Sequence, residues 1–233
     1  MLTKAEIKHI RSLREKKFRD ASGQFVVEGE KMVAEALQSG FTVDAVYHRE
    51  VIGEEDMARI SMLSSPSPVL ALVQKPQPRA VELRRSLYLG LDSVRDPGNM
   101  GTILRIADWF GIRTVFASMD SAEVYNPKVV QASMGSIFRV NTVYCDLPAL
   151  CARFRNMDMP VYGTFLDGRS IYTENLASEG LVVMGNEANG ISAETGALVS
   201  TRLTIPSFAE GRTAESLNVA VATAVALSEF RRR

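Results

Sequence analysis

The sequence predicts an α/β fold in which a parallel sheet is preceded by a smaller α/β unit. From residue 86 onward, short apolar strands alternate with helical segments, which is typical of a parallel sheet covered on both faces. A shorter α/β pattern ends at residues 75–79 (KPQPR), where two prolines interrupt any helix or strand ladder. We therefore expect units at 1–75 and 86–233 joined by a linker at 76–85, with a loop inside one domain as the alternative.

The elements of the first unit follow from apolar spacing and capping residues. Thr3 and Glu6 fit a capping box, and the apolar residues after them have helical spacing through residue 17. We expect this helix to be followed by strands at 24–28, 43–47 and 69–73 and by a helix at 30–39 that stops at Gly40.

The elements of the second unit follow from the same two periodicities. The sequence predicts strands at 87–91, 114–117, 140–144, 160–165, 180–184 and 202–205. It predicts helices at 99–110, 127–134, 147–157 and 214–233.

Composition excludes several function classes. The chain of 233 residues has two cysteines and two histidines, with no CxxC pair, so neither a zinc finger nor a Ser-His-Asp or Cys-His hydrolase is expected. We expect no metal, and two idle thiols in a reducing cytoplasm. No apolar leader follows Met1 and no run of about 18 apolar residues occurs, so we expect no signal peptide and no membrane span.

The charge is balanced overall but unevenly distributed. Lys plus Arg and Asp plus Glu both total 27, which argues against a bulk polycationic binder. Residues 3–19 nevertheless carry seven basic and two acidic side chains, and the chain ends in Arg231-Arg232-Arg233. Both clusters are candidate RNA contacts. The alternatives are a solvated helix face and favourable cations at a helix C-terminus.

Three loops at predicted strand ends are rich in Gly, Asn and Pro, and open parallel sheets bind ligands at that edge. The loop at 92–101 contains Asn99 and enters a helix with Arg105, while the other two lie at 184–192 (MGNEANGIS) and 205–220. Neither GxGxxG after a strand nor GxxxxGK[ST] occurs, so a standard dinucleotide site and a P-loop are unsupported. Taken singly, each loop has an ordinary alternative: Asn99 as an N-cap with Arg105 paired to Asp108, a tight turn around Glu187, and Ser216 as an N-cap.

Together and in this order, the three loops resemble motifs 1 to 3 of the SpoU/TrmH family of RNA ribose 2′-O-methyltransferases, of the SPOUT class. The resemblance covers roughly residues 86–233. By position and pattern, the first unit is similar to the family's small RNA-binding domain, which has an L30e-like fold. Residues 207–215 are longer than the shortest family version, so Phe208, Glu210 and Arg212 have no clear counterparts.

This resemblance implies a C-terminal trefoil knot running from about Leu181 to the last helix, a feature that periodicity cannot suggest. It implies the methyl donor S-adenosylmethionine, a tRNA or rRNA substrate, and a homodimer formed through the last helix and the helix after Asn99. When the family's motifs are matched to this sequence residue by residue, the resemblance implies that the cofactor is bound by Thr164, Gly185, Ile205 and Leu217. The catalytic positions are Arg105, as proton acceptor or substrate holder, supported by Asn99, Glu187, Ser216 and Asn218.

Two other function classes remain open. The first is a non-catalytic RNA-binding or ribosome assembly factor that keeps the same fold, and the second is an unrelated nucleotide-binding α/β module. The presence of Asn99, Arg105, Glu187, Ser216 and Asn218 together favours the enzyme, because a pure RNA binder does not need that set.

Overall fold

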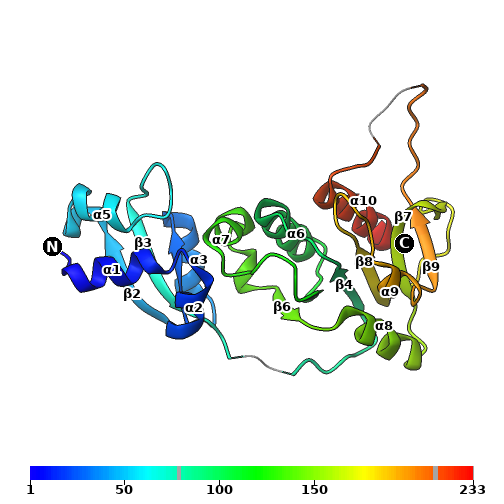
Figure 1. Cartoon of the computed structure of the whole chain (residues 1–233), viewed down its shortest axis with the longest axis horizontal. Coiled ribbons are helices and arrows are strands. Elements are labelled where there is room, and N and C mark those ends of the chain that lie inside the picture. Colours follow the sequence, from blue (N-terminus) through cyan, green and yellow to red (C-terminus); the bar gives the residue numbers. More distant parts are fainter. Residues whose placement is uncertain (78–79, 212–214, 233) are drawn as a thin grey trace.

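Two β-sheets follow one another along the chain in the computed structural model, which describes residues 1–77, 80–211 and 215–232 (Figure 1). The first sheet is antiparallel, with strand order β1-β3-β2. Its unit contains α1 (Lys4–Ser12), α2 (Lys16–Ser22), β1 (Gln24–Glu28), α3 (Glu30–Gln38), β2 (Val43–His48), α4 (Arg49–Ile52), α5 (Glu54–Ile60) and β3 (Val69–Gln74).

The N-terminal helix is capped as predicted but is shorter than predicted. Thr3 and Glu6 form the expected capping box at the start of α1. The expectation of one helix through residue 17 is wrong, because α1 ends at Ser12 and the chain turns before α2. The buried Arg19 stabilises this turn, since its Nη1 donates to the carbonyl oxygens of Leu13 at 2.8 Å and Arg14 at 2.9 Å. The short helices α4 and α5 were not expected.

The second sheet is parallel throughout, as predicted. Its six strands have the order β6-β5-β4-β8-β7-β9, and every neighbouring pair is parallel. The elements of this unit are β4 (Leu87–Leu91), α6 (Pro97–Trp109), β5 (Thr114–Ala117), α7 (Pro127–Ser133), η1 (Ser136–Phe138), β6 (Asn141–Tyr144), α8 (Leu147–Asn156), β7 (Val161–Ser170), β8 (Gly180–Met184), α9 (Ala193–Gly196), β9 (Thr201–Thr204) and α10 (Val219–Arg232).

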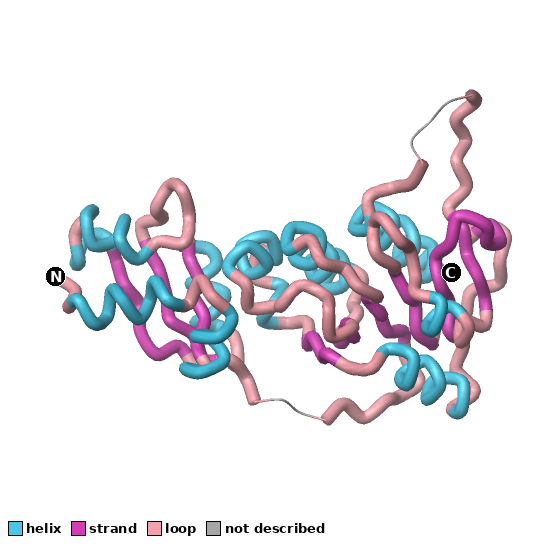
Figure 2. Tube along the Cα trace, viewed as in Figure 1, coloured by secondary structure: helices cyan, strands magenta, loops and turns pink. Residues whose placement is uncertain are grey.

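Helices cover both faces of this parallel sheet, which explains why its strands are apolar on both sides (Figure 2). Along β4, Leu89 belongs to the cluster under α6, α7 and α10, whereas Tyr88 belongs to the cluster under α8. The Tyr88 ring meets Phe154 of α8 edge-on, with 5.4 Å between the ring centroids. Alternate residues of each strand therefore pack into separate layers.

The two units share one apolar core. On one side of the contact lie β1 and the loop after α3, and on the other lie α7, η1 and the loop before α7. Phe25 packs on Tyr125 with 4.8 Å between ring centroids, and Phe41 meets Phe138 edge-on at 5.2 Å. A single cluster of buried hydrophobic side chains extends from the first sheet into the second. The N-terminal unit is thus packed against the body of the second unit as well as tethered to it.

Most predicted boundaries agree with the structure to within two residues, with two larger differences in the second unit. The strand expected at 160–165 extends to Ser170. The last helix begins at Val219 rather than at residue 214, and residues 212–214 lie outside the described part of the chain. Within the ranges that the structure describes, no helix is long and apolar enough to cross a membrane.

Candidate active site

The three predicted loops meet at the carboxyl edge of the parallel sheet. The Asn99 side-chain nitrogen donates to Glu187 Oε1 at 2.7 Å, and Asn218 Nδ2 donates to Asn99 Oδ1 at 2.9 Å. These contacts join side chains that lie 88 and 119 residues apart in sequence. The structure therefore brings together three of the five predicted catalytic positions through one chain of hydrogen bonds, which we call the amide chain.

Asn99 takes part in the amide chain because another residue caps its helix. Asp96 is the N-cap of α6, and its Oδ1 accepts from the Asn99 backbone N–H at 2.8 Å. The alternative that Asn99 merely caps this helix is wrong. Likewise, Asn218 rather than Ser216 caps α10, since its Oδ1 accepts from the backbone N–H groups of Ala220 at 2.9 Å and Val221 at 3.3 Å.

Arg105 lies exposed on α6, the helix that Asn99 enters. The alternative that it pairs with Asp108 is wrong, because Asp108 accepts from Ser136 Oγ at 2.9 Å and from Arg139 Nε at 2.8 Å. Across residues 1–77, 80–211 and 215–232, Arg105 has no hydrogen bond or ion pair. Its guanidinium donors are therefore available to a ligand.

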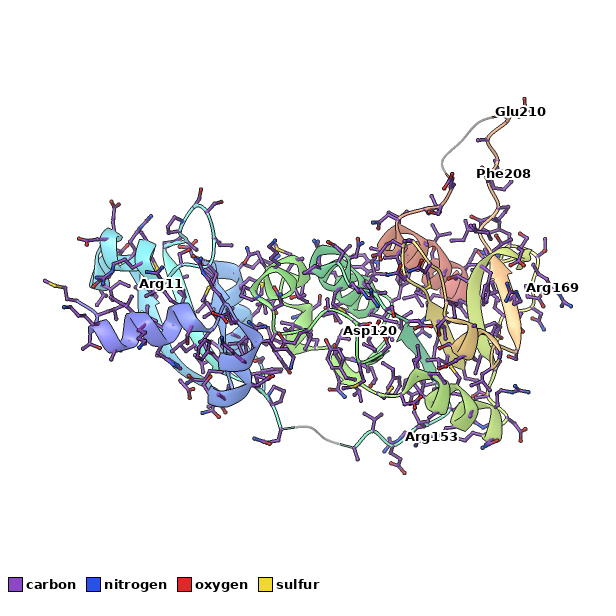
Figure 3. The ribbon with its side chains drawn as sticks, viewed as in Figure 1. Arg11, Asp120, Arg153, Arg169, Phe208 and Glu210 are labelled. Carbon is purple, nitrogen blue, oxygen red and sulfur yellow. The ribbon has the colours of Figure 1, made fainter. Side chains whose placement is uncertain are left out.

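Ser216 and Leu217 directly precede Asn218, and no hydrogen bond in the described part of the chain joins Ser216 to the amide chain. Both are exposed in the short segment before α10, and Ser216 has no hydrogen bond to Arg105 or to any other described residue. Phe208, which had no clear counterpart, is 83% exposed, and its ring stacks on Tyr172 with 6.4 Å between centroids. Phe208 and Glu210 lie on a segment that extends away from the sheet (Figure 3), while Arg212 lies outside the described residues.

Gly185 begins a hairpin at the end of β8 that has no room for a side chain. A Cβ at Gly185 would lie 2.3 Å from the Gly190 carbonyl carbon and 2.4 Å from the Ile191 nitrogen. The hairpin is closed by the backbone pairing of Asn186 with Gly190. Thr164 lies beside it, with its Oγ1 donating to the Val183 carbonyl at 3.4 Å, and Ile205 is half-buried at the end of β9. These three residues therefore follow or lie within the neighbouring strands β8, β7 and β9.

Sequence reasoning missed a buried carboxylate that fixes the first loop to the second. Asp92 is 5% exposed, and its Oδ2 accepts from the backbone N–H of Ser192 at 2.9 Å and from its Oγ at 2.8 Å. The feature of the sequence that could have identified Asp92 is its position immediately after a fully buried strand. Because a buried carboxylate without donors is costly, the two Ser192 donors hold the loops together.

Ser93, another missed residue, adopts a left-handed conformation that non-glycine residues seldom adopt, with φ 58°. Each of its polar groups has a partner: its N–H donates to Ser118 Oγ at 2.8 Å, its Oγ donates to Asp120 at 2.5 Å, and its carbonyl accepts from Asn186 Nδ2 at 2.8 Å. Hydrogen bonds from Arg95, Ser93 and Ser118 also hold the pKa of Asp120 well below its usual range. Asp120 lies near the middle of the molecule (Figure 3).

The N-terminal basic cluster is only partly available to a nucleic acid. Arg19 is buried against Glu123, Lys16 pairs with Asp20, and Lys17 pairs with Glu15. Arg14 donates to the carbonyl oxygen of Ser61. Among the described residues, the cluster members without an ion pair or such a bond are Lys4, Lys8 and Arg11, all exposed on α1.

The C-terminal arginines are also partly engaged. Arg231 donates to the Phe110 carbonyl at 2.9 Å, and Arg232 pairs with Glu229 at 2.6 Å. Arg233 lies outside the described residues. Arg231 and Arg232 therefore have partners within the protein, and the RNA contact at this tip stays a prediction.

No group of three or more His, Cys, Asp or Glu side chains in the described ranges could hold a metal ion. Both cysteines are free thiols. Burial, together with the nearby Asp92 carboxylate, raises the pKa of Cys151 to about 12, and burial also raises the pKa of Cys145. Neither thiol has the lowered pKa of a reactive cysteine.

Family models match both units of the chain. The model described as the SpoU rRNA Methylase family matches residues 86–228, and the model described as an MRM3-like substrate binding domain matches residues 4–72.

Full-length relatives agree with these matches. The 23S rRNA (guanosine(2553)-2′-O)-methyltransferase RlmP of Bacillus subtilis is 29% identical over 97% of this chain and 96% of its own length. A putative TrmH-family RNA methyltransferase from Porphyromonas gingivalis superposes with a TM-score of 0.90 at 42% identity, covering 100% of this chain and 99% of its own. The AdoMet-bound rRNA methyltransferase from Sinorhizobium meliloti superposes with a TM-score of 0.88 at 29% identity, covering 100% and 96%. The chain therefore belongs to the SpoU rRNA methylase family.

Proposed function

We propose that this protein transfers a methyl group from S-adenosylmethionine to a ribose 2′-hydroxyl of ribosomal RNA. The observation that carries the proposal is the amide chain Glu187–Asn99–Asn218, which joins the three family motifs at one edge of the sheet beside the helix of Arg105. RlmP of Bacillus subtilis is named for 2′-O-methylation of a guanosine in 23S rRNA, which favours rRNA over tRNA as the substrate class.

The residues around Gly185 suit this cofactor. Its hairpin packs so closely on Gly190 and Ile191 that only glycine fits at 185, and this tight turn lies at the carboxyl edge of the sheet. We assign cofactor binding to Gly185, Thr164, Ile205 and Leu217. When bound, the cofactor supplies an electrophilic methyl group on a sulfonium, and such chemistry needs no metal. A solved relative from Sinorhizobium meliloti holds AdoMet on the same fold.

Methyl transfer requires the ribose oxygen to lie in line with the methyl group and to lose its proton. We assign Arg105 the task of holding the ribose or its phosphate, because its guanidinium is exposed and makes no bond to the described residues. A guanidinium with a pKa above about 12 is a poor base, so this positioning role suits it better than proton removal. Asn99, Glu187 and Asn218 would keep the loops around it in place. Ser216 would join them on ligand binding.

We further propose that the protein works as a homodimer through α6 and α10. Trp109, Leu217 and Val221 are large hydrophobic residues left exposed on or beside these helices. The same helix α10 lines a shallow depression of about 470 Å³ together with Phe110 and Tyr172. The knot implied by the family would involve residue 181 to α10 and place this face at the contact. We propose the cytoplasm as the place of action, where ribosomal RNA is available.

Two measurements test the proposed function. Calorimetry with S-adenosylmethionine should show binding at micromolar concentrations, while NAD and ATP should not bind. Nucleoside mass spectrometry of rRNA and tRNA from a deletion strain should show the loss of one 2′-O-methylated rRNA position, restored by the wild-type protein but not by Arg105→Ala. Cofactor binding without any lost methylation would instead support the alternative of an RNA-binding or assembly factor. A position lost from tRNA would overturn the rRNA assignment.

A further inference from the structure

Two side-chain contacts connect the N-terminal unit to the two ends of α6, the helix that carries Arg105. In sequence α6 is separated from that unit by a polar, proline-containing segment, and in space α7 lies between them (Figure 1). Both contacts use an arginine that spans the boundary, and neither was expected from the sequence.

The first contact is a buried ion pair. Arg19 of α2 is 1% exposed, and its Nε and Nη2 approach Glu123 Oε2 at 3.1 and 2.5 Å. Its Nη1 is used by the carbonyl oxygens at the turn between α1 and α2. Arg19 therefore joins the fold of its own unit to a single carboxylate of the second unit. Because removing one partner of a buried pair leaves the other charge uncompensated, this contact holds the two surfaces together.

The loop that contains Glu123 is bonded to the loop that begins α6. The Ala122 N–H donates to the Val94 carbonyl at 2.8 Å, and the Val94 N–H meets Ser121 Oγ at 3.2 Å. Arg95 pairs with Asp120 at 2.7 Å. The next residue, Asp96, is the N-cap of α6. Arg19 is thus linked through one loop to the first turn of the helix.

The second contact reaches the opposite end of α6. Arg139 donates from Nη1 to Glu35 of α3 and from Nε to Asp108 at 2.8 Å, so one guanidinium holds a carboxylate of each unit. Gly135 lies close to the Glu35 side chain, since a Cβ at this position would lie 3.0 Å from Glu35 Cγ. Asp108 is three residues after Arg105 on the same helix.

We propose that Arg19 and Arg139 are positioning residues for methyl transfer. They fix the N-terminal unit against both ends of α6 and so set the distance between RNA held on that unit and Arg105. This inference rests on the proposed function. The shared apolar core packs the two units together, and the directional charged contacts add a fixed orientation that apolar packing alone does not specify. A misplacement of about 1 Å at a reacting centre costs roughly 100-fold in rate, so a fixed distance matters for turnover more than for binding.

The test uses two conservative variants and a matched control. Glu35→Gln and Glu123→Gln each remove one charge of a boundary contact while preserving side-chain shape. Glu179→Gln removes the charge of the Arg85–Glu179 pair, which lies within the second unit just before β4 and β8. Its carboxylate side chain is 26% exposed, compared with 31% for Glu35. We expect the kcat for rRNA methylation at saturating RNA to fall about 10- to 100-fold in the double variant. The RNA and S-adenosylmethionine dissociation constants should stay within about twofold, and Glu179→Gln should match the wild type.

A distance measured between one spin label on each unit tests whether the two arginine contacts hold the units in a fixed arrangement. Spin labels at Val51→Cys and Leu166→Cys, both more than three-quarters exposed, in a Cys145→Ser background should give a narrow distance distribution in the wild type. The double variant should broaden it. A broadened distribution with unchanged kcat would overturn the positioning role, and an unchanged distribution would show that the contacts do not fix the units. A wild type that binds S-adenosylmethionine and methylates no RNA would remove the proposed function itself, together with this role.

Discussion

The side chain of Asn218 both caps α10 and donates a hydrogen bond to the side chain of Asn99. Its oxygen caps α10, and its nitrogen donates to the oxygen of Asn99. Rotation of the Asn218 side chain would therefore cost both the helix cap and the amide chain. The start of the last helix is in this way coupled to the loop that precedes Arg105.

Asn99→Asp and Asn99→Ala should separate the two halves of this arrangement. Asp keeps an acceptor for Asn218 but places a second carboxylate against Glu187, whereas Ala removes both contacts. We expect kcat to fall about 10- to 100-fold in both at neutral pH, because a hydrogen bond to a charged group is lost. A like-charge neighbour raises the pKa of a carboxyl group, and the proton gained at lower pH can replace the missing N–H.

The ratio of Asn99→Asp to wild-type kcat should therefore rise as the pH falls from about 8 to 5, and the ratio for Asn99→Ala should stay flat. Asn141→Asp, exposed at the start of the edge strand β6, serves as the control and should match the wild type. Equal pH profiles for the Asp and Ala variants would contradict the contact between Asn99 and Glu187.

Gly185→Ala should weaken cofactor binding and lower stability. The added methyl group would lie within 2.4 Å of backbone atoms in the same hairpin, so the hairpin must open. We expect the free energy of unfolding to fall by about 1–3 kcal/mol and the affinity for S-adenosylmethionine to fall at least tenfold, measured by thermal denaturation and calorimetry. Gly40→Ala, where an added Cβ meets nothing within 4 Å, should change neither quantity. Full cofactor affinity in Gly185→Ala would place the cofactor elsewhere.

Arg105→Ala should lower the methylation rate without lowering stability. The guanidinium is exposed and has no partner in the described part of the chain, so its loss breaks no contact within the protein. We expect the melting temperature and cofactor affinity to equal those of the wild type and kcat to fall about 100-fold or more. Arg105→Lys should recover only part of the rate, because an ammonium cannot reproduce a bidentate contact. A variant that methylates rRNA at the wild-type rate would remove Arg105 from the site.

The two thiols should be nearly inert in the native protein. Burial raises the pKa of Cys151 to about 12 and also raises that of Cys145, so thiolate is scarce at pH values below the raised pKa. With a chromogenic disulfide reagent at about pH 8, Cys145 should react slowly, at a rate that rises with pH, and Cys151 should react only after unfolding. Cys145→Ser should eliminate the native reaction. Fast labelling of Cys151 would indicate that α8 opens readily.

Local sequence pattern was sufficient for the parallel sheet but not for its contacts. Short apolar strands such as 87–91 and 180–184 alternate with helices along the chain. This pattern can be read from neighbouring residues alone, so it predicts the strands without knowledge of distant contacts. The residue that caps α6 could not be predicted from the local sequence, because Asp96 and Asn99 are both good N-caps. The choice depends on Glu187, which lies 88 residues beyond Asn99 and accepts from its side chain. Arg19 looked like a surface cation for a similar reason, since its partner Glu123 lies 104 residues away.

The shared aromatic contact between the two units also has a consequence for how the chain folds as it is made. When the first unit leaves the ribosome, Phe25 of β1 and Phe41 of the loop after α3 lack their partners in the second unit, because Tyr125 and Phe138 follow about 100 residues later. Until then an apolar patch stays uncovered, and exposed patches of this kind favour aggregation during synthesis. The patch is buried only when the segment containing α7 and η1 has been synthesised and packs against it. The first unit therefore stays incompletely covered until this part of the second unit has folded.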